Sequence, residues 1–303
     1  MKILMLHNFY QQRGGEGVSF AAESEALREL GHEVDTFTLD NLEDLPRNGV
    51  HVAFKTIWSL KSYRTVRSLL RKKKYDILHV QNFFPLLSPS VYDAARSCGV
   101  PVVQALRNYR LFCMQGGLFR DGKLCEDCVV TGNPLPGIRA RCYRNSLAAS
   151  ISLGAFQVIH RRRKTWKRRV DTFIAVSACV KEKYVAAGWD PDSIVVKHNT
   201  VMPVPDVGSG NGGFFAVVGR LSDDKGLFML IDAWEILANQ KGVETKPLLK
   251  VIGDGPLMEE LKHEVDARSL NEFIQFTGAL PLNETYESMG GATATIQPSV
   301  RYE

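Results

Sequence analysis

Two cations in the stretch GRLSDDKG, residues 219–226, have the chemistry needed to hold a diphosphate. Arg220 and Lys225 come directly after the apolar run FFAVV, where a strand is expected to turn into a helix. An arginine can clamp phosphate oxygens with two hydrogen bonds, a lysine adds a mobile charge, and both would stabilise a negatively charged leaving group. The alternative interpretation is ordinary surface pairing of Lys225 with Asp223 or Asp224.

Two further loops follow apolar runs in the same half of the chain. GDGP, residues 253–256, follows LLKVI, and FTG, residues 276–278, ends the run FIQFTG. Each is a weak signal alone, because Gly-Asp-Gly-Pro is also a common turn before a helix with proline in its first turn. Their repeated placement after strand-like runs is what favours a binding site.

A third glycine-rich loop, QQRGGEG at residues 11–17, follows the first apolar run and precedes a helix-like pattern. Free amides at the start of a helix can bind an anion. However, the glycines do not match G-x-G-x-x-G, and Glu16 would repel a diphosphate placed against it. The alternative is a tight turn that needs positive φ angles.

These loops must be positioned by the elements around them, and strand-like runs alternate with helix-like patterns along the whole chain. This alternation predicts parallel sheets covered by helices. Residues 203–213, PVPDVGSGNGG, are rich in Pro and Gly and predict a linker. We therefore expect an α/β protein with two doubly wound domains, residues 1–203 and 204–303, facing a cleft at the carboxyl ends of their strands.

Charge divides the chain at the same place. Residues 1–203 carry 30 Lys and Arg against 18 Asp and Glu, whereas residues 204–303 carry 8 against 15. A basic half suits an anionic partner, such as lipid head groups, nucleic acid or a phosphorylated acceptor. The sequence has no apolar stretch of about 20 residues and no secretory signal, so we expect a cytosolic protein whose membrane contact is peripheral.

Four cysteines lie in one loop-like insertion, residues 108–146, with a C-x-x-C at its centre. They are Cys113, Cys125, Cys128 and Cys142. Four thiolates around a structural Zn²⁺ would supply the stability that this segment lacks, on the order of 10 kcal/mol. Free or redox-sensitive thiols and disulfides are the alternatives, since the spacing is wider than in common zinc fingers.

The stretch HRRRKTWKRR, residues 160–169, contains seven Lys and Arg and follows the apolar segment ISLGAFQVI. Lipid-facing apolar side chains followed by cations would form an interfacial anchor on an anionic membrane. A solvated basic helix with its tryptophan on the core side is the alternative. Nucleic acid is not expected as a partner, because no recognised nucleic-acid module or aromatic platform accompanies the cations.

The motifs GRLSDDKG, GDGP, FTGALP and SVRYE resemble, in order and spacing, the donor half of family 4 glycosyltransferases of the GT-B fold. DILHVQNFFPLLSPSVYDAAR, ALRNYRLFC and DTFIAVSACVKEKYVAAGW resemble one sugar-polymer branch of that family, so the resemblance covers nearly the whole chain. It implies two Rossmann-like domains that bind a nucleotide-diphosphate-sugar. The residues that it places at the nucleotide are Gly14, Gly15, Gly219, Arg220, Lys225, Gly253, Gly255, Thr277 and Gly278.

The resemblance also implies catalytic residues. Arg220 and Lys225 would carry the charge of the departing diphosphate, and Glu303 matches a glutamate that contacts the donor sugar. Family members continue past this point, so we expect the second domain to be incomplete and activity to be in doubt. Where many relatives place a histidine, this sequence has Arg107, which could bind an anionic acceptor or the donor sugar, or act as a structural clamp. His79 is expected to be a packed strand residue rather than a base.

The function implied is a retaining glycosyltransferase of surface-polysaccharide assembly. It would act on a carbohydrate or lipid-linked acceptor at the inner face of the membrane, without a metal in the reaction. An alternative is a truncated form that binds nucleotide or membrane without turnover. The residues identify neither the base nor the sugar nor the acceptor.

Overall fold

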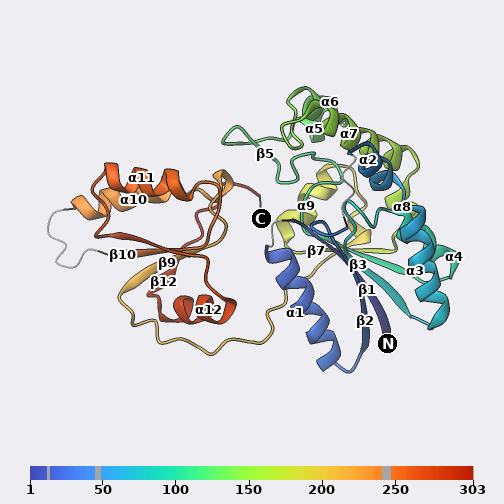
Figure 1. The fold of residues 1–303 in the computed structure, drawn as a ribbon, viewed down its shortest axis with the longest axis horizontal. Coiled ribbons are helices and arrows are strands. Elements are labelled where there is room, and N and C mark those ends of the chain that lie inside the picture. The colour runs from blue at the N-terminus through green and yellow to red at the C-terminus, as the bar shows by residue number, and fades with distance from the viewer. Residues whose placement is uncertain (12–13, 45–48, 241–246, 303) are drawn as a thin grey trace. The chain divides into compact units, whose positions relative to one another are not determined.

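The computed structural model describes residues 1–303 apart from 12–13, 45–48, 241–246 and 303. The chain forms two compact units. The first comprises Met1–Arg120, Cys125–Met202 and Tyr302, and the second comprises Asp121–Leu124 and Pro203–Arg301. Figure 1 shows a sheet covered by helices in each unit.

The first unit is built on a six-stranded parallel sheet in the order β2-β1-β3-β4-β7-β8. Its strands are β1 Lys2–Phe9, β2 Glu33–Asp40, β3 Ile77–Asn82, β4 Val102–Leu106, β7 Thr172–Ala175 and β8 Ile194–Val196. The central strands are almost continuously buried, as expected of parallel strands covered on both faces. The chain order reverses between β1 and β3, and such a switch point is where ligands of open α/β sheets bind.

Helices of the first unit fall into two groups. Those between the strands are α1 Gly15–Glu29, α2 Gly49–Ile57, α3 Leu60–Lys72, α4 Ser90–Ser97 and α9 Ala178–Ala186, with the short η1 Pro191–Ser193. The insertion between β4 and β7 contains a hairpin of β5 Phe119–Arg120 and β6 Lys123–Leu124, then α5 Asp127–Val130, α6 Leu135–Arg139, α7 Leu147–Arg162 and α8 Thr165–Arg169. Serine side chains cap α3, α7 and α9 by accepting a backbone N–H in the first turn.

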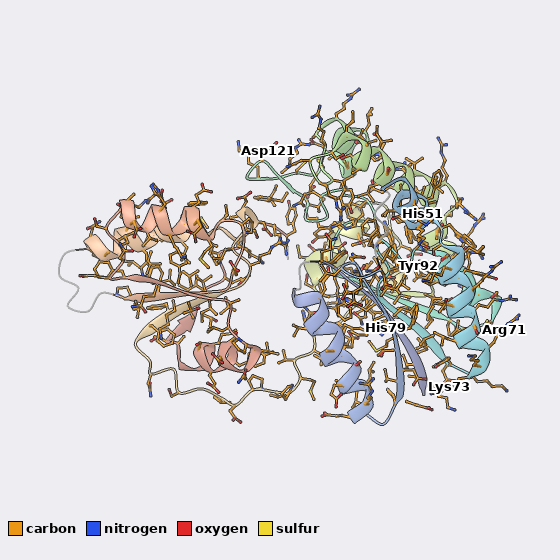
Figure 2. All side chains as sticks on the ribbon, viewed as in Figure 1. His51, Arg71, Lys73, His79, Tyr92 and Asp121 are labelled. Carbon is orange, nitrogen blue, oxygen red and sulfur yellow. The ribbon has the colours of Figure 1, made fainter. Side chains whose placement is uncertain are left out.

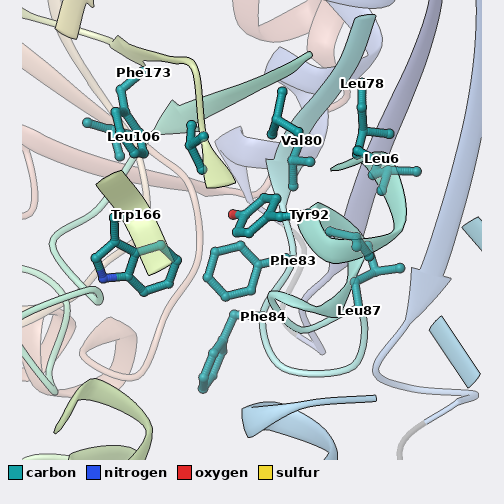
Figure 3. Packing of buried hydrophobic residues seen from close by; sticks show 14 of the residues in the cluster. Leu6, Leu78, Val80, Phe83, Phe84, Leu87, Tyr92, Leu106, Trp166 and Phe173 are labelled. Carbon is teal, nitrogen blue, oxygen red and sulfur yellow. The ribbon is translucent and has the colours of Figure 1, made fainter. Parts of the chain in front are cut away.

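The core of the first unit joins the sheet to this insertion. Leu6 and Val80 are fully buried on neighbouring strands, and they lie in the same cluster as Phe83, Tyr92 and Trp166 (Figure 3). The Trp166 ring stacks on Phe83 with ring centroids 6.0 Å apart. The basic stretch is therefore fixed to the core by the buried rings of Trp166 and His160.

The second unit has a four-stranded parallel sheet in the order β11-β10-β9-β12. Its strands are β9 Phe214–Val218, β10 Leu248–Ile252, β11 Ile274–Gly278 and β12 Ala294–Thr295, and its helices are η2 Asp223–Lys225, α10 Leu227–Asn239, α11 Met258–Ala267 and α12 Leu282–Gly291. The chain moves outward from β9 to β11 and returns to the other side of β9 with β12. The switch point of this sheet is therefore between β9 and β12.

The sequence predictions of parallel sheets and alternating helices are confirmed in both units. The segment 203–213, predicted to be a linker, contains neither helix nor strand, but its end is hydrogen-bonded to the second unit. The Gly210 and Gly212 amides donate to the carbonyls of Gly290 and Gly291 at the end of α12. This part of the segment packs on the second unit, because a side chain at Gly208 would lie 2.0 Å from the Gly290 oxygen.

Candidate functional site

The switch point of the second unit is lined by the two predicted phosphate ligands. Arg220 and Lys225 follow β9, while Gln297 and Ser299 follow β12, and together they line a small pocket of about 10 Å³. The Lys225 ammonium donates to the Ser299 hydroxyl at 3.3 Å. The arrangement brings a guanidinium, an ammonium and a hydroxyl to one edge of the sheet, which is a donor set suited to phosphate oxygens.

Glycines at this edge let three loops pack backbone against backbone. A side chain at Gly253, whose φ is +141°, would lie 1.9 Å from the Gly219 oxygen, and one at Gly255 would lie 2.3 Å from the Leu221 oxygen. The sequence predicted that Gly253 and Gly255 leave room for a nucleotide. In the structure they are required by the GRLSDDKG turn itself, a role that the sequence did not reveal.

The loop after β11 joins the same edge. The Gly253 amide donates to the Gly278 carbonyl at 2.9 Å, and Gly278 has a φ of +75° with open space around it. The Thr277 hydroxyl bonds to the Gly278 carbonyl at 3.0 Å. The predicted nucleotide-binding residues of this half, from Gly219 to Gly278, therefore meet at one edge of one sheet. Glu303, predicted to contact the donor sugar, lies outside the described residues.

A buried carboxylate inside the GRLSDDKG turn was not singled out from the sequence. The Asp224 carboxylate accepts from the Ser222 hydroxyl at 2.6 Å and lies 2.8 Å from the Arg301 guanidinium. Burial opposes its ionisation, but the Ser222 hydroxyl and the Arg301 charge outweigh burial and hold the pKa of Asp224 below its usual value. The sequence offered no signal for this pair, because its members are far apart along the chain.

In the first unit, Arg107 follows β4 and is held in a closed network. Its Nε donates to Gln81 at 2.9 Å, its Nη2 lies 3.2 Å from the Glu23 carboxylate, and its Nη1 donates to Asn199. The side chains of Arg107 and Glu23 are each only 6% exposed. With one bond each from Nε, Nη1 and Nη2 to protein groups, Arg107 has the contacts that the structural-clamp interpretation requires, and its role toward a ligand stays a prediction.

His79 belongs to the same network and is a packed strand residue, as expected. Figure 2 shows it among the strands of the first unit, whereas His51 lies on α2. The Gln81 amide nitrogen lies 2.8 Å from Glu23 and 3.1 Å from Nε2 of His79, so it donates to both. Burial lowers the pKa of His79 to about 4, and the neutral ring carries its proton on Nδ1.

The network places an ionised carboxylate next to that neutral ring. Burial opposes the ionisation of Glu23, but the Lys197 charge, the Gln81 hydrogen bond and the Arg107 charge favour the carboxylate, and its pKa is lowered. The Lys197 ammonium lies 3.3 Å from the second oxygen of the carboxylate. Glu23 is thus the centre of the network, and its place in an ordinary helical pattern offered no reason to single it out.

The loop QQRGGEG enters α1 without the turn that the alternative interpretation required. Gly14 precedes the helix with an extended backbone, and the described glycines with positive φ do not include Gly14, Gly15 or Gly17. A side chain at Gly14 or Gly15 would meet open space. The Glu16 carboxylate accepts from the Asn108 amide at 3.0 Å and so faces the loop after β4. No requirement of the fold explains Gly14 and Gly15.

The four cysteines of the insertion lie near one another, because Cys113, Cys142 and Cys125 add to the effect of burial in raising the pKa of Cys128. Within the part of the chain that the structure describes, no group of three or more His, Cys, Asp or Glu side chains is placed to hold a metal ion. Burial raises the pKa of Cys128 to about 11 and also raises the pKa of Cys142, which keeps both thiols protonated. None of the six cysteines forms a disulfide, and the zinc and free-thiol interpretations both stay predictions.

The apolar segment before the basic stretch is largely turned inward. In α7, Leu153 and Phe156 are buried, and Ile151 is the exposed member of the segment at 50%. Leu153 and Phe156 therefore do not face lipid, whereas Ala155, Val158 and Ile159 are partly exposed and the membrane contact of the segment stays a prediction. The cations at 161–164, 167 and 168 are exposed. Among the described residues, none of the helices has the length and apolar character needed to cross a membrane.

Two family models together match most of the chain. Residues 14–200 match the glycosyl transferase 4-like domain, and residues 207–303 match the glycosyl transferases group 1. A curated relative is an uncharacterized 42.6 kDa protein in the cps region of Klebsiella pneumoniae. It is 21% identical over 262 residues, which are 75% of this chain and 63% of the relative. The chain thus spans less than two thirds of that relative's length.

Solved structures share the fold at low sequence identity. The apo form of the lipopolysaccharide outer core galactosyltransferase WaaB has a TM-score of 0.55 and 15% identity, over 99% of this chain and 74% of that one. Anabaena Alr3699/HepE in complex with UDP-glucose has a TM-score of 0.56 and 16% identity, over the same shares of the two chains. By these matches and its parallel sheets, the chain has the GT-B fold and belongs to the glycosyl transferase 4-like family, with a group 1 glycosyl transferase domain in its second half.

Proposed function

We propose that this protein is a retaining glycosyltransferase that transfers a sugar from a nucleotide-diphosphate-sugar to a carbohydrate or lipid-linked acceptor in surface-polysaccharide assembly. The observation that carries the proposal is the pocket of Arg220 and Lys225 at the switch point of the second unit. The relative from a cps region supports the polysaccharide context. The HepE structure is a complex with UDP-glucose, and this supports a nucleotide-sugar donor.

In this proposal, residues 204–303 form the donor domain and residues 1–203 the acceptor-side domain. Arg220 and Lys225 hold the diphosphate and stabilise its charge as the bond to the sugar breaks. A phosphate oxygen of the leaving group takes the proton of the acceptor hydroxyl, and Arg220 and Lys225 take the role that a metal ion would otherwise have. The side chain of Glu303 contacts the donor sugar. Retention of the anomeric configuration rests on the resemblance to family 4.

We also propose that the first unit lies on an anionic membrane at the cytoplasmic face. Residues 129–170 carry ten Lys and Arg, and residues 49–75 carry eight, without an Asp or Glu in either segment. The two segments meet where α2 packs on α7. Phe54 on α2 is 70% exposed, and Leu147 and Ile151 on α7 are about half exposed. Cations around exposed apolar side chains fit the interface of an anionic bilayer.

A nucleotide panel tests the donor part of the proposal. The thermal unfolding midpoint of the protein is measured with UDP-, GDP- and ADP-sugars at equal concentrations. A ligand present at 100 times its Kd stabilises by about 2.7 kcal/mol, so the true donor class is expected to raise the midpoint by several degrees. If none of the three classes raises it, the second unit is not a nucleotide-sugar site.

A further inference from the structure

The GRLSDDKG turn carries as many carboxylates as cations. Arg220 and Lys225 are balanced by Asp223 and Asp224 within eight residues. Asp223 is exposed and screened by water, but the Asp224 side chain is only 9% exposed. A buried negative charge next to Lys225 would attract its ammonium and repel a diphosphate placed at the pocket. The turn alone therefore has no net positive charge with which to attract an anion.

The compensating charge comes from the segment after β12. Its Arg301 guanidinium lies 2.8 Å from the Asp224 carboxylate, on the oxygen that Ser222 does not occupy. The side chain of Arg301 is 32% exposed, so the pair lies partly inside the protein, where charges are weakly screened. With Arg301 included, the turn and the segment 298–301 together carry three cations and two carboxylates, a net positive charge.

Backbone contacts hold Arg301 in this position. The Val300 amide donates to the Asp224 carbonyl at 3.0 Å, and the Ser299 hydroxyl accepts from Lys225. Gly226 has a φ of +65°, and a side chain there would lie 2.1 Å from the Pro298 oxygen. The turn and the segment 298–301 are thus packed together along their length. A substitution in the turn is therefore expected to displace the segment 298–301, and the reverse.

We propose that Arg301 is a positioning residue for the donor diphosphate. It neutralises the buried carboxylate of Asp224, and thereby reduces the repulsion between that carboxylate and a diphosphate bound at Lys225 and Arg220. The inference rests on the proposed function of this pocket as the diphosphate site. It adds a residue that does not line the pocket and that acts through the charge of another side chain.

The test compares a nucleotide with its nucleoside in titration calorimetry. UDP and uridine are used, or the matching pair for GDP or ADP if the panel selects another base. In Arg301→Gln we expect the affinity for UDP to fall at least tenfold, while the affinity for uridine changes less than twofold. In Asp224→Asn/Arg301→Gln, which removes both charges in nearly unchanged volume, we expect UDP affinity to return to within threefold of the wild type.

Three results would overturn the inference. They are an Arg301→Gln variant that binds UDP within twofold of the wild type, equal losses for UDP and uridine, and a double variant as weak as the single one. Lys225→Ala separates this failure from that of the proposed function. If Lys225→Ala weakens UDP binding and Arg301→Gln does not, the pocket binds phosphate and the inference alone is wrong. If Lys225→Ala has no effect, both are wrong.

Discussion

The guanidinium of Arg107 lies 3.2 Å from the carboxylate of Glu23, and both side chains are almost completely buried. The partners come from α1 and from the end of β4, 84 residues apart in the sequence. Gln81 bonds to both of them, so neither charge faces an apolar surface unpaired. Such a pair adds little stability over apolar replacements, but it becomes costly when only one partner is removed.

We therefore expect Glu23→Gln to destabilise the protein by about 3 to 5 kcal/mol, because Arg107 would keep its charge in a buried position without a counter-ion. Urea unfolding measures the change. Lys262→Gln is the matched control, since Lys262 forms an exposed pair with Glu259 on α11 and is expected to cost at most about 1 kcal/mol. Equal losses of unfolding free energy in the two variants would mean that the buried pair matters no more for stability than an exposed pair.

The acid side of the stability profile depends on two buried histidines. Burial lowers the pKa of His79 and of His160 to about 4 from the ordinary value of 6.5. Below pH 6.5 the unfolded chain then binds more protons than the folded one. Stability should fall as the pH drops from 6.5 toward 4, by up to about 1.4 kcal/mol per pH unit for each histidine. Glu23, whose pKa is lowered, adds its own loss only below its ordinary value of 4.5.

Urea unfolding at intervals from pH 7.5 to 5.0 isolates the histidines from the carboxylates. His79→Gln should flatten this part of the profile, even if it lowers stability at every pH. The same is expected of His160→Gln, because the ring nitrogens of His160 bond to Thr165 and to the Ile57 carbonyl, and an amide can replace them in part. A wild-type profile that is flat between pH 7 and 5 would contradict the buried neutral state of both rings.

The alternation of strand-like and helix-like patterns was enough to predict both sheets, because parallel strands and covering helices leave strong periodic signals. It also identified the loops after strands, and hence Arg220 and Lys225. The side chains that contact these loops could not be predicted from the sequence. Glu23 sits in an ordinary helical pattern, and Asp224 looked like a surface carboxylate. Each is explained only by a cation that the fold brings from a distant segment.

The apolar run ISLGAFQVI shows a second limit. It is apolar at so many positions that its periodicity does not identify a single buried face, and burial in the structure comes from packing against the core. The packing role of Gly253 and Gly255 against the GRLSDDKG turn could not be predicted, since backbone packing between loops leaves no local signal.

Gly253→Ala is expected to destabilise the second unit by more than about 2 kcal/mol. The new side chain would collide with the Gly219 carbonyl, and the φ of +141° disfavours any residue except glycine. Urea unfolding is again the measurement. Gly15→Ala is the control, because a side chain there meets open space and the backbone is not in the positive-φ region. A loss below about 0.5 kcal/mol in Gly253→Ala would mean that the three loops do not need their close approach.

Removal of the pocket cations should weaken nucleotide-diphosphate binding selectively. We expect Arg220→Ala and Lys225→Ala each to reduce the affinity for UDP by about 1 to 3 kcal/mol, which is roughly 5- to 150-fold. Calorimetric titration with UDP measures this, and the affinity for uridine should stay unchanged. Lys262→Ala on α11 is the matched control, being a lysine of the same unit away from the pocket. Unchanged UDP affinity in both pocket variants would remove these residues from the site.

Binding to lipid should depend on the cations that surround α7 and α8. The protein is expected to sediment with vesicles that contain anionic lipid at moderate salt, and to stay in the supernatant with neutral vesicles. Each cation near the surface contributes about 1 kcal/mol, so replacing Arg162, Arg163, Lys167 and Arg168 with glutamine should reduce vesicle affinity at least tenfold. These side chains are exposed, and the buried Trp166 between them is left intact.

A second variant separates the apolar contribution from the charge. Phe54→Ser removes a ring that is 70% exposed on α2, and it should weaken binding to anionic vesicles without changing its salt dependence. Both variants should keep the UDP affinity of the wild type, since their changes lie in the first unit. Equal sedimentation with neutral and anionic vesicles would contradict an electrostatic membrane surface. Strong salt-dependent binding to mixed oligonucleotides, with none to vesicles, would assign the basic segments to nucleic acid instead.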